Sequence, residues 1–157
     1  MTKEVTLSAR ARETRTGSAG WMIQRLAGGV NDAMKASLAE RELSLDQFVL
    51  LMTLAEGDGL TQTEIGAKVR FPGYTVTRAL DALSARGLVE RRPDAKSRRV
   101  HRVVMTAAGQ ALMPALFETV ARQNAGLLAP LTAKERDSFL ALLAKLVAAH
   151  QDGLSPD

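Results

Sequence analysis

The sequence predicts a mainly α-helical protein that carries one small β-hairpin. Apolar residues recur at helical spacing over most of the chain. Three Ser/Thr-x-x-Glu/Gln patterns, which are typical of helix starts, begin at Ser44, Thr61 and Thr132. Two runs rich in β-branched residues, 88–92 and 100–106, flank a short polar segment, and this arrangement is typical of a hairpin.

Length and composition narrow the class of protein. The chain has 157 residues, which suits one compact domain. It has no cysteine, which excludes disulfides, thiolate metal sites and thiol nucleophiles. The first twenty residues lack the apolar core of a signal peptide, and no later run is long enough for a membrane span. We therefore expect a soluble cytoplasmic protein that has no contact with membranes.

The N-terminal third predicts a tail followed by two helices. Residues 1–17 are polar and rich in arginine, so we expect a flexible tail. A long helix follows over about 18–42, and Gly28-Gly29 within it suggests a bend or the close approach of another backbone. The next helix begins at Ser44 and is apolar nearly all round, which predicts a central, buried position.

The middle of the chain predicts a helix-turn-helix followed by a hairpin, or wing. A short helix begins at Thr61, and Phe71-Pro-Gly73 forms the turn into a second helix over 74–86. The second helix places its apolar residues on one face. Its opposite face is polar and consists of Tyr74, Thr75, Thr77, Arg78 and Asp81.

Two further helices complete the predicted fold. The first spans about 107–128, where we expect Pro114 to kink it. The last begins at the capping pattern of Thr132 and carries an apolar stripe to about residue 150. Residues 151–157 are expected to fray.

Basic residues concentrate in one segment of the chain. Residues 68–102 carry ten basic and three acidic side chains, although the whole chain has a net charge of only +4. Such a segment can bind a phosphate backbone by releasing counterions. A solvated basic surface is the alternative, and the charge count alone does not separate the two.

Over roughly residues 20–150, the chain resembles the MarR family of winged helix-turn-helix transcription regulators. The matching motifs are Leu45-Asp-Gln-Phe48, Thr61-Gln-Thr-Glu-Ile65, Thr75-Val-Thr-Arg78 with Leu80-Asp81, Gly87-Leu-Val-Glu-Arg-Arg-Pro93, Arg98-Arg99 and Met105-Thr106-Ala-Ala-Gly109. The resemblance implies a single domain over 18–150, with dimerisation helices at about 18–42 and 107–150 and a winged helix-turn-helix at about 44–106. It also implies a homodimer that binds a pseudo-palindromic double-stranded operator, and an aromatic or phenolic effector.

The sequence departs from the family pattern at two places. The wing of the family usually reads Asp-x-Arg, with a carboxylate that braces the arginine, whereas Ser97 occupies that position here. Asp94 is a candidate replacement that the sequence leaves open. The recognition helix begins Pro72-Gly73-Tyr74, where the family more often has a Ser or Thr cap.

Candidate DNA-binding residues lie on three elements. Thr75, Thr77 and Arg78 could enter the major groove, where arginine pairs with guanine and a threonine methyl meets thymine. Arg98 and Arg99 at the wing tip suit the minor groove, whereas Arg91 and Arg92 suit phosphates or salt bridges in the wing. The remaining candidates are Gly73 and Tyr74 at the start of the recognition helix, and Thr61 and Gln62, for which helix capping is the alternative explanation.

The sequence offers a candidate ligand cleft but no catalytic site. Trp21, Met22, Arg25, Phe48 and Met52 could bind an aromatic carboxylate, with core packing as the alternative. The two histidines are isolated, so neither a metal nor another cofactor is expected, and no enzyme motif occurs. We expect a repressor that a small aromatic or phenolic ligand releases from DNA. Two alternatives stay open: a ligand-independent or architectural DNA-binding protein, and a protein-interaction module.

Overall fold

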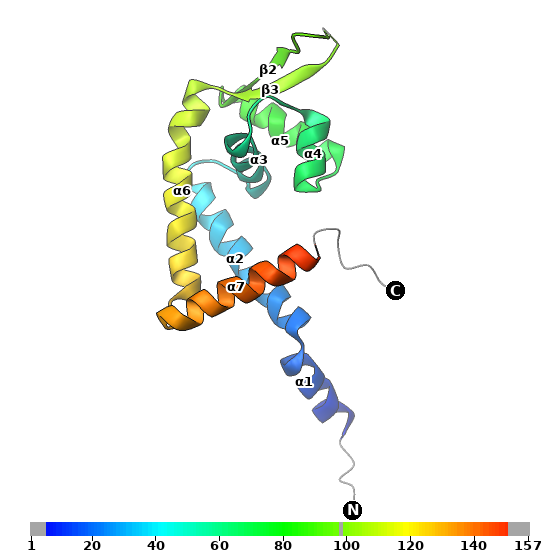
Figure 1. Cartoon of the computed structure of the whole chain (residues 1–157), viewed down its shortest axis with the longest axis vertical. Helices are drawn as coiled ribbons and strands as arrows, with labels where there is room; N and C mark the ends of the chain where they lie inside the picture. The colour runs from blue at the N-terminus through cyan, green and yellow to red at the C-terminus, as the bar shows by residue number, and fades with distance from the viewer. Residues whose placement is uncertain (1–5, 98, 151–157) are drawn as a thin grey trace, which may run out of the picture. The chain divides into compact units, whose positions relative to one another are not determined.

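The computed structural model describes residues 6–97 and 99–150, which form seven α-helices and three β-strands (Figure 1). The elements in order are α1 (Leu7–Gly17), α2 (Ala19–Ala39), α3 (Leu45–Glu56), β1 (Leu60–Thr61), α4 (Gln62–Val69), α5 (Gly73–Ala85), β2 (Val89–Pro93), β3 (His101–Met105), α6 (Ala107–Leu128) and α7 (Ala133–Ala149). The predicted fold class, mainly helical with a small hairpin, is confirmed. Contacts within the chain define two units, residues 1–120 and 121–157.

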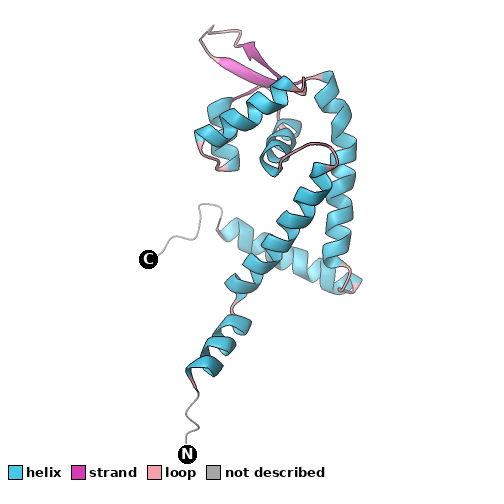
Figure 2. Cartoon of the chain, turned by 180° about the vertical axis from the view of Figure 1, so that it is seen from behind, coloured by secondary structure: helices cyan, strands magenta, loops and turns pink. Residues whose placement is uncertain are grey.

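The core of the first unit forms around α3. Leu50, Leu51 and Leu54 of this helix are at most 1% exposed. They belong to a cluster that includes Ile65 of α4 and Leu80 of α5 and extends to both long strands. Figure 2 shows α3, α4 and α5 packed beside the hairpin. The central, buried position predicted for α3 is confirmed.

The sheet is antiparallel in the order β1-β3-β2. The hairpin register places Val89 opposite Met105 and Arg91 opposite Val103. The sequence predicted this hairpin but missed β1, in which Leu60 pairs with Val103 from the other side. A strand of two residues is too short to produce an alternating pattern. It matters because it attaches the wing to the start of α4.

All three predicted capping boxes are present. The side chains of Ser44, Thr61 and Thr132 each accept a hydrogen bond from the backbone N–H three residues later. In return, the side chain at that later position accepts from the backbone N–H of the cap residue. Because these contacts lie within four residues of sequence, they fix where α3, α4 and α7 begin.

The N-terminal segment differs from the prediction. Residues 1–17 were expected to form a flexible tail, but the structure forms helix α1 over Leu7–Gly17, capped by Thr6. The helix has no buried residue, so the sequence carries no apolar stripe that could reveal it. The rest of that tail, residues 1–5, and the predicted frayed end, residues 151–157, lie outside the described residues.

Helices α2 and α6 pass through residues that usually disfavour helices. No atom lies within 4 Å of a Cβ built at Gly28 or Gly29 in α2, so the described residues supply no close backbone neighbour there. Helix α6 continues from Ala107 to Leu128 with Pro114 inside it. The kink expected at Pro114 therefore does not end the helix.

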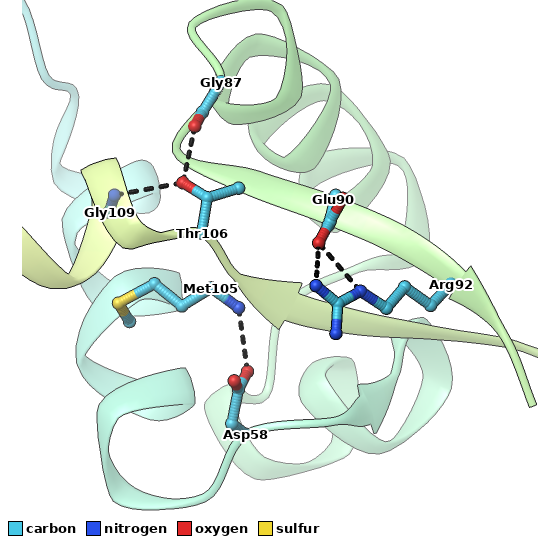
Figure 3. Close-up of polar contacts among 7 residues, drawn as sticks. All are labelled: Asp58, Gly87, Glu90, Arg92, Met105, Thr106 and Gly109. Carbon is cyan, nitrogen blue, oxygen red and sulfur yellow. Dashed lines mark hydrogen bonds and ion pairs between the residues drawn. The ribbon is translucent and has the colours of Figure 1, made fainter.

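The junction between the wing and α6 is closely packed (Figure 3). Thr106 Oγ1 donates to the carbonyl of Gly87 at 2.6 Å and accepts from the N–H of Gly109 at 3.1 Å. A Cβ on Gly109 would lie 2.2 Å from the carbonyl oxygen of Leu88, so only glycine fits. The backbone N–H of Met105 donates to Asp58 Oδ1 at 2.9 Å. These bonds fix β3 and the first turn of α6.

The second unit contains the end of α6 and all of α7. Helix α7 has no buried residue, and its large apolar side chains Leu140, Leu142, Leu146 and Val147 are at least 50% exposed. The apolar stripe predicted for this helix therefore lies on its surface in a single chain. No helix in the described parts of the chain is long and apolar enough to cross a membrane.

Candidate nucleic-acid interface

Helix α5 presents a polar face to solvent and an apolar face to the core. Val76, Leu80 and Leu83 are fully buried, whereas Tyr74 is 75% exposed and the Arg78 side chain 78% exposed. Thr77 is also exposed, and Thr75 is half-buried. The N-cap is Pro72, which makes no side-chain capping bond. The outward face predicted for this helix is confirmed.

Two side chains on this face have partners within the protein. Gln62 Nε2 donates to Thr77 Oγ1, which in turn donates to the carbonyl of Gly73 at 2.9 Å. Arg78 Nη2 lies 3.7 Å from Asp46 Oδ2 on α3. These contacts fix Thr77 and Arg78 relative to α3 and α4, the helices that pack against α5.

Thr61 and Gln62 both make hydrogen bonds within the protein. Thr61 Oγ1 accepts from the N–H of Glu64 at 3.2 Å, and the Thr61 N–H donates to Glu64 Oε2 at 2.7 Å. The backbone N–H of Thr61, followed by its hydroxyl, holds the pKa of Glu64 below its usual range. The capping explanation for Thr61 is therefore present in the structure.

Both arginines in the stem of the wing form salt bridges. Arg91 Nη2 lies 2.8 Å from Asp81 Oδ1 on α5, so this pair joins β2 to α5. Arg92 pairs with Glu90 on the same strand, as Figure 3 shows. Salt bridges were one of the two interpretations offered for these arginines, and the structure contains them. Phosphate contact, the other interpretation, stays a prediction.

The wing is braced at its base by Asp94. This carboxylate accepts from the backbone N–H of Lys96 at 2.8 Å and pairs with the Arg102 guanidinium. The bond from Arg102, followed by that from Lys96, holds the pKa of Asp94 below its usual range. Asp94 therefore supplies a carboxylate within the wing, and the arginine that it pairs with is Arg102 on β3.

The wing tip carries exposed cations. Lys96 and Arg99 are both exposed, and Ser97 accepts the backbone N–H of Val100 through its carbonyl at 3.1 Å. Arg98, the other tip arginine predicted to contact DNA, lies outside the described residues.

Not every basic residue of the segment 68–102 faces solvent freely. The guanidinium of Arg86 donates to the carbonyls of Glu42 at 2.8 Å and Arg41 at 3.0 Å, so it joins the end of α5 to the turn after α2. Arg102 donates to the carbonyl of Gly59 at 2.9 Å and pairs with Asp94. Both arginines were counted as cations for phosphate, and in the free protein both have structural partners.

The structure does not bring the predicted ligand residues together. Phe48 and Met52 line a hollow of about 570 Å³ with Met34, Val49 and Val120. Trp21 instead lines a different hollow, against α1. The guanidinium carbons of Arg25 and Arg15 lie 5.0 and 5.2 Å from the centre of its ring. Trp21 therefore lies in a different hollow from Phe48 and Met52, and ligand binding by these residues stays a prediction.

Sequence reasoning named Asp81 and Asp94 on this surface but not their arginine partners, and it missed Asp46. Asp46, Asp81 and Asp94 each pair with an arginine of the basic segment 68–102. Their pairings join residues between 8 and 32 positions apart, so no local pattern reveals them. Within residues 6–97 and 99–150, no group of three or more His, Asp or Glu side chains is placed to hold a metal.

The fold and this surface define a winged helix-turn-helix protein. A solved structure of a MarR-family transcriptional regulator from Silicibacter pomeroyi is 31% identical, with a TM-score of 0.72, over 88% of this chain and 94% of that chain. The sequence profile of the MarR family matches residues 36–100. The chain belongs to the MarR family of transcriptional regulators.

Other relatives agree with this assignment. The transcriptional repressor Rv2887 of Mycobacterium tuberculosis is 28% identical over 127 residues, which are 81% of this chain and 91% of the repressor. The repressor CouR, solved bound to a 23-mer DNA duplex, is 28% identical with a TM-score of 0.77 and covers 85% of this chain and 95% of that chain. The protein is therefore a transcriptional regulator and not an enzyme.

Proposed function

We propose that the protein is a homodimeric repressor that binds a pseudo-palindromic DNA operator and leaves it when a small aromatic or phenolic ligand binds. The main support is the polar face of α5, which carries exposed Tyr74, Thr77 and Arg78 in the same unit as a wing with exposed Lys96 and Arg99. A helix enters the major groove and a basic hairpin suits the minor groove. A regulator of this kind acts in the cytoplasm, where its operator lies.

In the proposed complex, α5 reads bases. Arg78 leaves Asp46 and donates two hydrogen bonds to a guanine, while Thr75 and Thr77 offer methyl groups to thymine. Tyr74 and Gly73, in the first turn of α5, approach the backbone or an adjacent base. The N–H groups of Thr61 and Gln62 lie at the start of α4, a position that favours a phosphate.

The wing contributes contacts outside the major groove. Arg98 and Arg99 enter the minor groove, where a narrow A·T-rich groove attracts arginine. Arg91 and Arg92 remain in their salt bridges and add weaker attraction to phosphates, because Asp81 and Glu90 already neutralise their charges.

Dimerisation uses the helices that flank the winged region. Helices α2, α6 and α7 expose large apolar side chains, among them Leu26, Phe117 and Leu146, each about half exposed. Covering such surfaces drives association. In this proposal, residues 18–42 and 107–150 dimerise and 44–106 bind DNA, all within one domain over 18–150. Two-fold symmetry then places half-sites about 34 Å apart.

The hollow beside α3 supports the effector part of the proposal. Phe48, Met52 and Val120 give it an apolar lining, and Lys68 lies on its wall. An aromatic ring would contact the apolar side chains while a carboxylate pairs with Lys68. Trp21 and Arg25, whose ring and guanidinium stack on each other, could hold a second aromatic acid at the start of α2.

Duplex selection from a random pool tests DNA binding. The wild-type protein should enrich a pseudo-palindrome, and Arg78→Ala should weaken that operator by about 1–3 kcal/mol and relax preference at one base pair per half-site. Lys134→Ala, at the start of α7, is the control and should leave operator affinity and base preference unchanged. If Arg78→Ala lost the same affinity for the operator and for random duplex and kept its base preference, major-groove reading by α5 would be contradicted.

Ligand release needs a separate measurement. Aromatic carboxylates should raise the melting temperature and lower operator affinity, and Lys68→Ala should weaken both effects for carboxylates but not for neutral phenols. If no aromatic acid or phenol shifts the melting temperature at millimolar concentration, the protein is a regulator without such an effector.

A further inference from the structure

Arg102 lies on β3 at the point where three segments of the first unit meet. Its Nη1 donates to the carbonyl of Gly59 at 2.9 Å, just before β1. The same nitrogen lies 3.9 Å from Glu64 Oε2, the capping carboxylate of α4. Its Nε donates to Asp94 at the base of the wing tip. One guanidinium therefore contacts the wing, the β1 turn and the start of α4.

Both oxygens of the Asp94 carboxylate have a partner within the protein. Its side chain is only 13% exposed, although it lies in a hairpin that projects from the helices. One oxygen holds the backbone N–H of Lys96, which shapes the turn that carries the tip cations. The other oxygen holds Arg102. The carboxylate therefore links the shape of the tip to the position of β3.

The polar contacts continue from Arg102 to the recognition helix. Glu64 holds the N–H of Thr61, the cap residue of α4. The next residue, Gln62, donates to Thr77 on α5. The wing and α5 are thus joined through the start of α4 by side-chain contacts, in addition to the salt bridge between Arg91 and Asp81.

We infer that Asp94 and Arg102 form a positioning pair, which holds the wing against the start of α4 so that the tip cations and α5 reach DNA together. This inference rests on the proposed function. In this inference Arg102 acts through other residues, because Asp94 pairs with its Nε and the Gly59 carbonyl and Glu64 lie beside its Nη1.

Removing the charge of Asp94 distinguishes a positioning role from simple repulsion between its carboxylate and DNA phosphates. A carboxylate close to DNA repels phosphate, so electrostatics alone predicts that Asp94→Asn binds the operator more tightly. A positioning role predicts the opposite. Losing the brace should weaken operator binding by about tenfold and lower the salt slope by about 1 or more per subunit, because the wing cations lose their phosphates.

Two control variants make the comparison specific. Glu90→Gln removes a carboxylate that pairs with Arg92 on the wing stem, and it should leave operator affinity unchanged or raise it. Arg102→Lys keeps the positive charge but cannot reach three partners with one ammonium group, so it should weaken binding as Asp94→Asn does. A role of Arg102 that depends on charge alone would leave Arg102→Lys near wild type.

Amide hydrogen exchange of the free protein provides a readout that needs no DNA. In Asp94→Asn, the backbone N–H of Lys96 should exchange faster, while the amides of α5 keep their protection, which also verifies that the variant is folded. The inference is overturned if wild type binds its operator and Asp94→Asn binds equally or more tightly. If wild type selects no duplex at all, the proposed function fails, and the inference fails with it.

Discussion

Arg86 shows how a residue that looks available for DNA can serve the fold. Its guanidinium donates to the carbonyls of Arg41 and Glu42 in the turn after α2. We predict that Arg86→Ala lowers the free energy of unfolding by about 1–3 kcal/mol, since charged hydrogen bonds to two carbonyls are lost. We expect the slope of operator affinity with salt to stay unchanged, because the Glu42 and Arg41 carbonyls hold the Arg86 guanidinium.

Urea unfolding and a salt series check this prediction. Lys35→Ala is a suitable control, because Lys35 forms only an exposed ion pair with Asp32 at 3.9 Å, and such pairs contribute at most about 1 kcal/mol. A lower salt slope in Arg86→Ala with unchanged stability would show that Arg86 contacts phosphate after all.

Gly109 is the residue whose replacement should damage the fold most. A methyl group there would meet the Leu88 carbonyl at 2.2 Å, and backbone cannot move aside as a side chain can. We predict that Gly109→Ala costs more than about 3 kcal/mol in thermal or urea unfolding. Gly57→Ala should cost less than about 1 kcal/mol, since no atom lies within 4 Å and the backbone there is extended at φ −168°. Equal stability of the two variants would refute the close approach.

The capping box of α7 predicts an acid-dependent stability. The Thr132 backbone N–H, followed by its hydroxyl, holds the pKa of Glu135 below the usual 4.5. Because the folded pKa is depressed, this stabilisation is full above pH 4.5 and is lost as pH falls through the folded value. Unfolding of wild type and Glu135→Gln between pH 7 and 3 should therefore converge on acidification. A difference that is constant with pH would exclude the carboxylate as the cause.

The wing offers a prediction at Ser97, where the family usually has aspartate. Since Asp94 already braces the hairpin, a second carboxylate adds little order and brings negative charge to the tip. We predict that Ser97→Asp weakens operator binding a few-fold, by roughly 1 kcal/mol or less, and that Ser97→Ala has almost no effect. The operator affinities of the two variants, measured against wild type, test this prediction. Tighter binding by Ser97→Asp than by wild type would mean that the wing tip lacks order.

Elements that depend on nearby residues were predictable, and those that depend on distant partners were not. The starts of α3, α4 and α7 followed from capping patterns four residues long. Helix α1 was missed because it buries nothing, and β1 because it has two residues. The polar face of α5 was predictable from periodicity. The partners of Arg78 and Arg86 were not, because folding alone brings Asp46 and the Glu42 carbonyl to them.

On the scale of the whole molecule, the exposed apolar helices predict a dimer. Light scattering of the wild-type protein should give twice the 16.9 kDa mass of one chain. Leu146→Glu places a charge among exposed apolar residues of α7, so it should shift the mass toward 16.9 kDa and weaken operator binding. Lys145→Glu, its neighbour on the helix, changes the charge without removing an apolar side chain. A wild-type mass near that of one chain would exclude the dimer.

The contact between Arg78 and Asp46 also affects how a regulator of this kind would search a genome. In the free protein, the carboxylate lies 3.7 Å from the guanidinium. On random DNA only phosphate oxygens compete with Asp46 for the arginine, so we expect the carboxylate to weaken the contact of Arg78 there. A correctly placed guanine offers two hydrogen bonds and can compete for the arginine. We therefore expect Asp46 to lower operator affinity slightly and to shorten each pause at a wrong sequence.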